Sequence, residues 1–227
     1  MSVNNLSVVR QQHGFTIVEL AIVISVTSIV AVVFLGIITN YFVTITRNNE
    51  LTDMTINSQN LLRTTVQNIR FGNGVEQSNT ITDPNAPSGG WNTNNSAFVI
   101  VIPVPAEDSS KNYIIDPDTG SPYMNELVYY KNGNTLMERV LANPNAVGNT
   151  TVTTCPSSSS STSCPPDKLL ATYVSSMTFT LYDQNAAVTT TPTSARSVNI
   201  SLTMQRNAPV SPLSLTDSIR VTLRNRF

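Results

Sequence analysis

Histidine is almost absent from this sequence of 227 residues, which contains one, His13. No site beyond residue 13 can therefore use a histidine as a general base or as a metal ligand. The sequence also lacks a glycine-rich phosphate-binding loop and a serine nucleophile motif. These absences predict no catalytic residues, no metal and no cofactor, and they argue against an enzyme.

Charge and cysteine are scarce as well. Charged residues make up 12% of the chain, with 13 Lys and Arg against 14 Asp and Glu, and this balance argues against a general nucleic-acid-binding protein. The two cysteines, Cys155 and Cys164, bracket a serine-rich segment, and no further cysteine is present to complete a zinc site. An even pair of cysteines outside the cytoplasm predicts a disulfide.

Residues 15–39 form a long apolar run in which Glu19 is the single charge. A helix rises about 1.5 Å per residue and the hydrocarbon core of a bilayer is about 30 Å thick, so about 20 residues span it. No proline occurs between residues 15 and 82, which permits one continuous helix. The run predicts a single transmembrane helix, and Arg10 on its N-terminal side predicts a cytoplasmic N-terminus.

The junction between the polar leader and the apolar run carries a motif of seven residues: Gly14-Phe15-Thr16-Ile17-Val18-Glu19-Leu20. It resembles the processing and methylation motif of the type IV pilin-like family, which includes pilins and the pseudopilins of type II secretion. The resemblance implies that a prepilin peptidase cleaves after Gly14, that the new amine of Phe15 is methylated, and that subunits polymerise through the apolar helix. The natural partner of Glu19 in a filament would be the Phe15 amine of a neighbouring subunit.

The same resemblance implies further partners and a location. Other pilins, minor pilins, the inner-membrane assembly machinery and membrane lipid are the expected partners. The chain would cross the cytoplasmic membrane once before assembly and reach the cell surface in a pilus afterwards. The alternative, an ordinary single-pass anchor, leaves both Glu19 and the Gly14–Phe15 junction unexplained.

An α+β pilin-like fold follows from the resemblance and from the periodicity of the apolar residues. A second, amphipathic half of the helix carries an apolar stripe from Leu51 to Ile69 that faces a core. An antiparallel β-sheet in the headgroup covers this stripe. The expected organisation has four parts. They are a leader at residues 1–14, a transmembrane and polymerisation half of the helix at 15–39, an amphipathic half at 40–71 and a β-rich extracytoplasmic headgroup at 72–227.

Local patterns predict the parts of the headgroup. The first part, residues 72–96, is rich in Asn, Thr, Pro and Gly and is expected to be a linker. Asn132-Gly133 between two apolar segments predicts a hairpin with a type I′ turn. Asp116 and Asp118 flank a proline, and because the further ligands of a calcium loop are missing they indicate a turn. Strands are expected where apolar and polar residues alternate or an apolar run is short: residues 97–104, 127–131, 135–141, 177–182, 198–204 and 219–223.

A narrower resemblance covers residues 174–227. A strand that ends in Tyr182-Asp183, a following Arg-x-Val strand from Arg196, and a final Leu-Arg-Asn resemble the C-terminal half of PilW-type minor pilins and J-type pseudopilins. This implies a minor pilin that joins an assembly-priming or tip complex. A J-like secretion pseudopilin is the first alternative, and a DNA-binding or adhesive tip subunit is the second.

One basic concentration occurs near the C-terminus. Residues 196–227 contain five arginines and one acidic residue, Asp217. Arg220, Arg224 and Arg226 are an even number of residues apart and would project from one face of a strand. We favour a solvated strand face, or a face that meets acidic residues of another minor subunit, over DNA capture by a fibre tip for these three residues.

Overall fold

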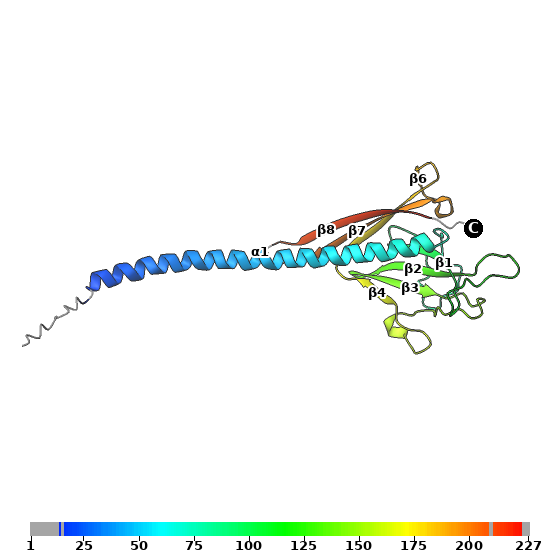
Figure 1. The fold of residues 1–227 in the computed structure, drawn as a ribbon, viewed down its shortest axis with the longest axis horizontal. Coiled ribbons are helices and arrows are strands. Elements are labelled where there is room, and N and C mark those ends of the chain that lie inside the picture. Colours follow the sequence, from blue (N-terminus) through cyan, green and yellow to red (C-terminus); the bar gives the residue numbers. More distant parts are fainter. Residues whose placement is uncertain (1–13, 15, 209–210, 224–227) are drawn as a thin grey trace, which may run out of the picture. The chain divides into compact units, whose positions relative to one another are not determined.

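The computed structural model describes residues 14, 16–208 and 211–223. The chain divides into two compact units, Met1–Asn48 and Asn49–Phe227, which are considered separately here. The helix α1, Ile17–Phe71, contributes to both of them (Figure 1). The expected continuous helix that ends at residue 71 is therefore observed.

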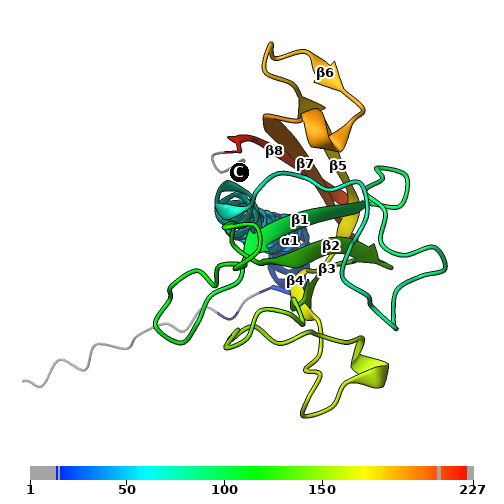
Figure 2. The ribbon, with the colours of Figure 1, turned by 90° about the vertical axis from the view of Figure 1, so that its right-hand side faces the viewer.

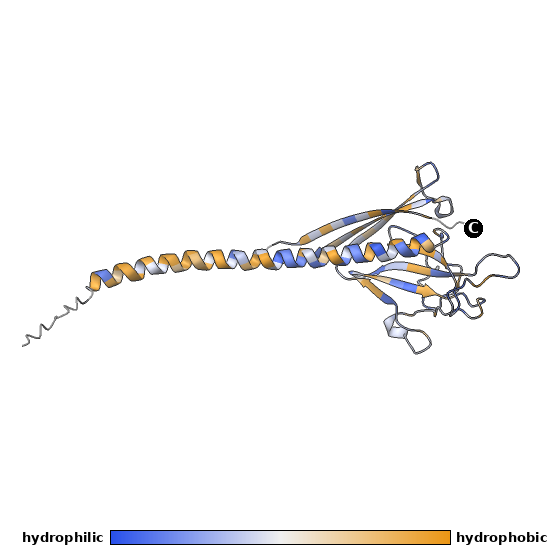
Figure 3. Ribbon diagram, in the orientation of Figure 1, coloured by the Kyte–Doolittle hydropathy of each residue, from blue (hydrophilic) through white to orange (hydrophobic). Residues whose placement is uncertain are grey.

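The first unit consists of the N-terminal part of α1. Apolar residues lie on all sides of this part of the helix, as Figure 3 shows, and nearly all of its residues are exposed. Isoleucine and valine are abundant here, and a lipid environment favours the helix because it leaves no other partner for the backbone. By length and composition, α1 is the helix in the described part of the chain that is able to cross a membrane.

The second unit begins with the remainder of α1, whose buried residues recur on one stripe: Met54, Ser58, Leu61, Leu62, Thr65 and Ile69. The helix ends where the chain meets the first strand. The Gly72 amide donates to the Asn68 carbonyl at 2.9 Å, and a Cβ at Gly72 would lie 2.7 Å from Ile102 Cγ2 and 2.9 Å from the Pro103 carbonyl oxygen. Glycine is therefore required by this close approach.

Two four-stranded antiparallel sheets form the rest of the second unit, where one sheet was expected. Their orders are β1-β2-β3-β4 and β6-β5-β7-β8. The expectation was incomplete because alternation identifies strands and their apolar faces without identifying which edges pair. The strands of the two sheets are β1 Val99–Pro105, β2 Met124–Asn132, β3 Thr135–Leu141, β4 Lys168–Ala171, β5 Val174–Tyr182, β6 Val188–Thr189, β7 Ser197–Arg206 and β8 Leu213–Thr222.

Both sheets share one core with the Asn49–Phe71 part of α1, which packs against each of them (Figure 1, Figure 2). Ile69 of the helix, Ile102 of β1 and Ile200 of β7 belong to the same buried cluster. A second, smaller cluster around Trp91 and Val128 lies on the opposite face of the first sheet. The helix stripe therefore has two sheets to cover it.

The segment 72–96 was expected to be a linker, and that prediction was wrong. Val75 and Trp91 are buried, and single bridges join Glu76 to Val101 and Ser78 to Asn92. The segment covers the outer face of β1 and β2. The polar composition of the segment did not indicate this role, because few of its residues, among them Val75 and Trp91, are apolar and buried.

The β2–β3 hairpin forms as expected, but its turn differs by one residue. Asn132 pairs with Thr135, so Gly133 and Asn134 are the central residues. Gly133 has a φ of 60°, and Asn134 is not among the described residues with a positive φ. A glycine with positive φ at the first central position is the pattern of a type II′ turn, whereas type I′ requires positive φ at both positions.

Two short 3₁₀ helices, Ser157–Ser159 and Pro192–Ser194, lie in the connections before β4 and before β7. The segment 116–120 forms the expected turn, in which Asp116 accepts hydrogen bonds from the Asp118 amide and the Thr119 hydroxyl.

Candidate processing and assembly site

The predicted cleavage site lies at the start of the described chain. Gly14 is exposed and has no regular secondary structure, and α1 begins three residues later at Ile17. Phe15, the predicted site of N-methylation, lies outside the described residues. An exposed glycine ahead of a helix is compatible with access by a peptidase, because cleavage requires an extended backbone.

Thr16 and Glu19 cap the N-terminus of α1 reciprocally. The Thr16 amide and hydroxyl donate to Glu19 Oε2 at 2.9 Å and 3.0 Å, and the Glu19 amide donates to the Thr16 hydroxyl at 3.2 Å. This is a capping box, in which each side chain satisfies a backbone amide that the helix leaves free. Our sequence analysis missed it, although Thr-x-x-Glu ahead of an apolar run is the sequence signal for it.

The hydroxyl groups along the apolar run are also satisfied within the helix. Five side-chain hydroxyls each donate a hydrogen bond of 2.6 to 2.9 Å to the carbonyl four residues earlier. They belong to Ser25, Thr27, Ser28, Thr39 and Thr44. A hydroxyl without a partner is costly in an apolar environment. These residues therefore present a largely apolar surface to lipid or to another helix, and Glu19 is the charged group on it.

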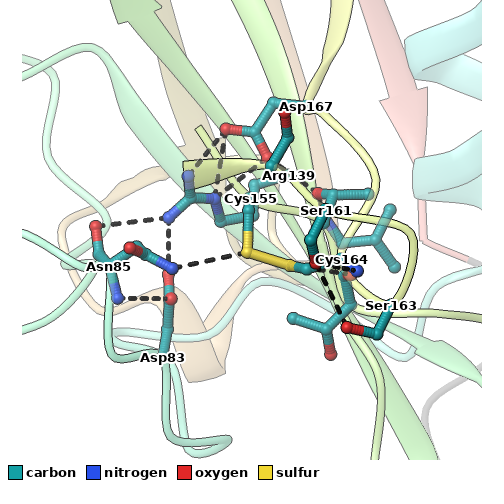
Figure 4. Close-up of a disulfide and its surroundings, with 12 residues drawn as sticks. Asp83, Asn85, Arg139, Cys155, Ser161, Ser163, Cys164 and Asp167 are labelled. Carbon is teal, nitrogen blue, oxygen red and sulfur yellow. Dashed lines mark hydrogen bonds and ion pairs between the residues drawn. A yellow bond between two sulfur atoms is a disulfide. The ribbon is translucent and has the colours of Figure 1, made fainter. Parts of the chain in front are cut away.

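The predicted disulfide between Cys155 and Cys164 is present, with a Cα–Cα distance of 5.6 Å (Figure 4). It closes a loop of exposed serine and threonine residues, 157–163. Asn85 Nδ2 lies 3.4 Å from Cys155 Sγ, so the bridge contacts the segment 72–96 as well as its own loop. The predicted disulfide is confirmed. It closes its own loop and also contacts a second segment of the headgroup through Asn85.

Beside the disulfide lies a buried arginine that the sequence analysis did not identify. Arg139 on β3 is 1% exposed. Its Nε and Nη2 donate to the two carboxylate oxygens of Asp167 at 3.1 Å and 2.7 Å, and its Nη1 donates to Asp83 Oδ2 at 2.8 Å (Figure 4). The two-pronged contact with Asp167 is the geometry in which arginine binds carboxylates best.

Neutral side chains complete this network. Trp91 Nε1 donates to Asp83 at 2.7 Å, and the hydroxyls of Tyr130 and Thr154 donate to Asp167 at 2.6 Å and 2.7 Å. The Arg139 guanidinium also lies over the rings of Trp91 and Tyr130, at 5.3 Å and 5.8 Å. Tyr129 and Tyr130 are neighbours on β2, so their side chains point to opposite faces of the sheet. Tyr129 is in the core, and Tyr130 is half-buried in this network.

The electrostatics of the network indicate a structural role. Burial on its own would raise the pKa of Asp167, but hydrogen bonds from Arg139, Tyr130 and Thr154 outweigh it and lower this pKa. Burial, followed by the hydrogen bond to Asp167, raises the pKa of Tyr130. Asp167 therefore stays ionised and Tyr130 stays protonated near neutral pH, so neither is poised for proton transfer.

A pair of carboxyl groups lies where the segment 72–96 meets β2. Glu126 on β2 is buried and its Oε1 accepts bonds from the Thr80 amide and hydroxyl at 2.7 Å and 2.6 Å and from the Ile81 amide at 3.2 Å. Glu76 lies beside it, and burial together with the charge of Glu126 raises the pKa of Glu76 to about 7. Glu76 therefore titrates near neutral pH.

The arginines of the basic concentration near the C-terminus are placed differently from one another, and Arg220, Arg224 and Arg226 are the three that were predicted to share a face. Arg220 on β8 donates from Nε and Nη2 to the Ser197 hydroxyl at 3.0 Å and 2.9 Å, and its guanidinium lies 3.9 Å from the ring centroid of Tyr182. Arg206 forms an ion pair with Glu50 of α1. Arg224 and Arg226 lie outside the described residues.

Comparison with known families bears on the N-terminal segment. Residues 9–35 match the family model of the prokaryotic N-terminal methylation motif. This motif is the leader of type IV pilins and pseudopilins, which are structural subunits. It supports a pilin or pseudopilin precursor that a prepilin peptidase processes and that assembles with other pilins, and it fits a membrane-anchored precursor. No curated protein matches the chain.

Proposed function

We propose that the chain is the precursor of a minor type IV pilin, a structural subunit of a pilus. The observation that carries the proposal is the methylation motif at residues 9–35, which extends into the apolar part of α1, together with the side-chain hydroxyls of that part, which donate to carbonyls of the same helix. A subunit that moves from the bilayer into a filament needs such a helix, because both environments are apolar.

The N-terminus would act in two steps. Cleavage after Gly14 exposes the amine of Phe15, and methylation leaves that amine positively charged. In the capping box both Thr16 donors bind Glu19 Oε2. The other oxygen of this carboxylate can then accept the Phe15 amine of a neighbour, so that pairing sets the axial register while apolar packing supplies most of the association.

Two features favour a minor over a major pilin. Gly36 stands in the apolar half of the helix, where many major pilins carry a helix-breaking proline, and α1 runs through this position without interruption. The first two segments that resemble PilW-type minor pilins and J-type pseudopilins include β5 and β7, which pair with each other in one sheet; the final Leu-Arg-Asn begins at Leu223, directly after β8, and its last two residues lie outside the described chain. We propose that the subunit joins an assembly-priming or tip complex.

The processing step can be tested by co-expression of the full chain with a prepilin peptidase and sequencing of the new N-terminus. We expect the mature chain to begin at Phe15. Gly14→Val should block cleavage because a branched side chain fills the space that glycine leaves, while Gly14→Ala, the smaller change, should retain part of it. A mature chain that begins at another residue would rule out the proposal.

The role of Glu19 can be tested in assembled fibres. Glu19→Val should leave membrane insertion intact, because it removes a charge from an apolar segment, but should lower recovery of the subunit in sheared fibres. Ser25→Ala is a suitable control, since it removes a hydroxyl that bonds within its own helix. Recovery of the Glu19→Val subunit at the level of the control would contradict the pairing.

A J-like pseudopilin of type II secretion is the alternative, and the same residues support it. Deletion of the gene separates the two functions, because loss of surface fibres indicates a pilin and loss of protein export indicates a pseudopilin. DNA binding at the fibre tip is a further alternative. Binding of the mature chain to duplex DNA at low salt, abolished by Arg220→Ala, Arg224→Ala and Arg226→Ala together, would support it.

A further inference from the structure

The strand β8 has one free edge. It is the last strand in the order β6-β5-β7-β8, so β7 is its neighbour on one side and no described strand lies on the other (Figure 2). In the described part of the chain, no main-chain hydrogen bond from Leu213–Thr222 leaves the β7 ladder. The free edge is ten residues long.

The register shows which backbone groups face this edge. Leu223 donates its amide to the Arg196 carbonyl, on the side of β7. Main-chain groups alternate between the two sides of a strand, so the odd-numbered residues of β8 face β7. The amides and carbonyls that face the free edge belong to Ser214, Thr216, Ser218, Arg220 and Thr222.

The other sheet edges are protected in ways that β8 is not. Single bridges from Glu76 and Asn94 cover β1, the β3–β4 pairing has a register shift, and β6 is two residues long. Proteins also blunt free edges with proline, lysine or a bulge. Residues 213–222 contain neither proline nor lysine, and their pairing with β7 has no register shift. Such an edge is a template for another strand.

A groove of about 550 Å³ runs between this edge and α1. On the helix side it is lined by Arg63 and Arg70, both exposed, and by Val66 between them. On the strand side it is lined by Asp217, whose Oδ2 is buried without a hydrogen-bond partner. In the described part of the chain none of the three charged residues forms an ion pair within 4 Å, so the groove has one excess positive charge.

We propose that the free edge of β8 binds an extended, acidic segment of another protein chain by strand addition. The backbone of that segment would pair with the outward-facing groups of β8, and side chains on one of its faces would enter the groove. A carboxylate there would contact Arg63 or Arg70, and a hydroxyl or amide would donate to Asp217. Main-chain pairing supplies affinity in this mode of recognition, and alternate side chains supply specificity.

In a pilus the partner would be another subunit, so the identity of the partner depends on the proposed function. The binding reaction itself does not, because it needs neither cleavage nor filament assembly. The full chain in detergent micelles can therefore be tested with synthetic peptides. One peptide of ten residues alternates valine and threonine with two valines replaced by glutamate, and a second carries lysine at those two positions.

We expect the glutamate peptide to bind and to slow hydrogen exchange at the outward amides of β8, while the lysine peptide binds at least about ten-fold more weakly. Arg63→Glu with Arg70→Glu should reverse this preference. Ser218→Pro removes an outward amide and should weaken binding by about ten-fold, whereas Ser218→Ala retains the amide and should not. Lys111→Glu, a charge reversal on a side chain that is 78% exposed elsewhere, is the control for net charge.

Several results would overturn the proposal. They are no binding of the glutamate peptide, equal binding of both peptides, and binding without protection of the β8 amides. Binding of duplex DNA that Arg63→Glu with Arg70→Glu removes while the edge amides exchange freely would assign the groove to nucleic acid instead. If Ser218→Pro fails to fold, the charge-reversal pair on the exposed face of α1 decides the outcome.

Discussion

The apolar part of α1 and the headgroup satisfy their polar groups by opposite means. Between residues 16 and 44 the side-chain hydrogen bonds join residues three or four apart. In the headgroup, Arg139 reaches Asp83 across 56 residues of sequence and Asp167 across 28. The first region can therefore change its surroundings without breaking a long-range contact, whereas the second depends on one tertiary structure.

This difference separates the two roles that we propose. A helix that leaves a bilayer and enters a filament needs local satisfaction of every polar group. A headgroup displayed outside the cell needs a fixed shape, and distant contacts that must form together provide it. Four predictions test this contrast, and they are ordered by the size of the change that we expect.

Removal of Arg139 should have the largest effect. Arg139→Ala leaves Asp83 and Asp167 buried without a cation, and we expect a loss of about 3–5 kcal/mol in the free energy of unfolding of the headgroup. Chemical denaturation followed by near-ultraviolet circular dichroism measures it. Lys111→Ala, which removes an exposed ion pair with Glu107, should change the same free energy by less than about 1 kcal/mol. Equal effects of the two variants would contradict a structural role for the network.

Loss of the disulfide should cause the second-largest decrease in the free energy of unfolding. Cys155→Ala with Cys164→Ala opens a loop with a sequence separation of nine, and the chain-entropy account gives a loss of about 2.5–3 kcal/mol. Since Asn85 contacts Cys155, we also expect faster exchange of the amides in the segment 72–96. Thiol labelling of the unreduced wild-type protein should find no free cysteine, and reactive thiols there would refute the pairing.

The free energy of unfolding of the headgroup should depend on pH because of Glu76. Because burial and Glu126 raise its pKa to about 7, the native state holds a proton that the unfolded state loses near pH 4.5. The resulting stability is complete below about pH 4.5 and is lost as pH rises through about 7, by roughly 1–2 kcal/mol after allowance for solvent screening. Glu76→Gln should flatten this part of the profile. An unchanged profile in this variant would exclude Glu76 as its source.

Disruption of the capping box at the start of α1 should have the smallest effect, a local increase in amide exchange. Thr16→Val removes the hydroxyl that accepts the Glu19 amide, and we expect exchange of that amide in detergent micelles to accelerate about five-fold, the equivalent of one N-cap. Thr16→Ser retains the hydroxyl and should restore slow exchange. The headgroup should keep its stability in both variants, because none of the bonds to Thr16 is long-range.

What could be predicted from the sequence follows the same division. The helix to Phe71, the membrane-length run and the methylation motif all depend on residues close together in the chain. The disulfide was predictable because only two cysteines are present. The hairpin was identified from a glycine between two apolar segments, and its turn was misplaced by one residue because the pairing of Asn132 with Thr135 sets it.

The features that were missed depend on contacts between distant segments. Nothing near Arg139 indicates that it is buried, and a lone arginine in an alternating strand is more often exposed. The division into two sheets, the cover that Trp91 provides and the groove beside β8 depend on the same kind of contact. Arg220 was identified as a basic residue, but its hydrogen bonds to Ser197 and its position over the Tyr182 ring follow from the pairing of β7 with β8 and with β5.

Four features can be read from the amino-acid sequence: a prepilin-type leader motif, a helix able to cross a membrane, one pair of cysteines and a strand-rich C-terminal part. Each of these is a matter of local spacing, of composition or of the number of residues of one kind. Three further features are visible only in the folded chain: two sheets share one helix, three charges lie in the interior beside the disulfide, and no described strand pairs with the outer edge of β8. These arrangements are set by packing, because the burial of a side chain and the partner of a strand depend on residues far away in the chain.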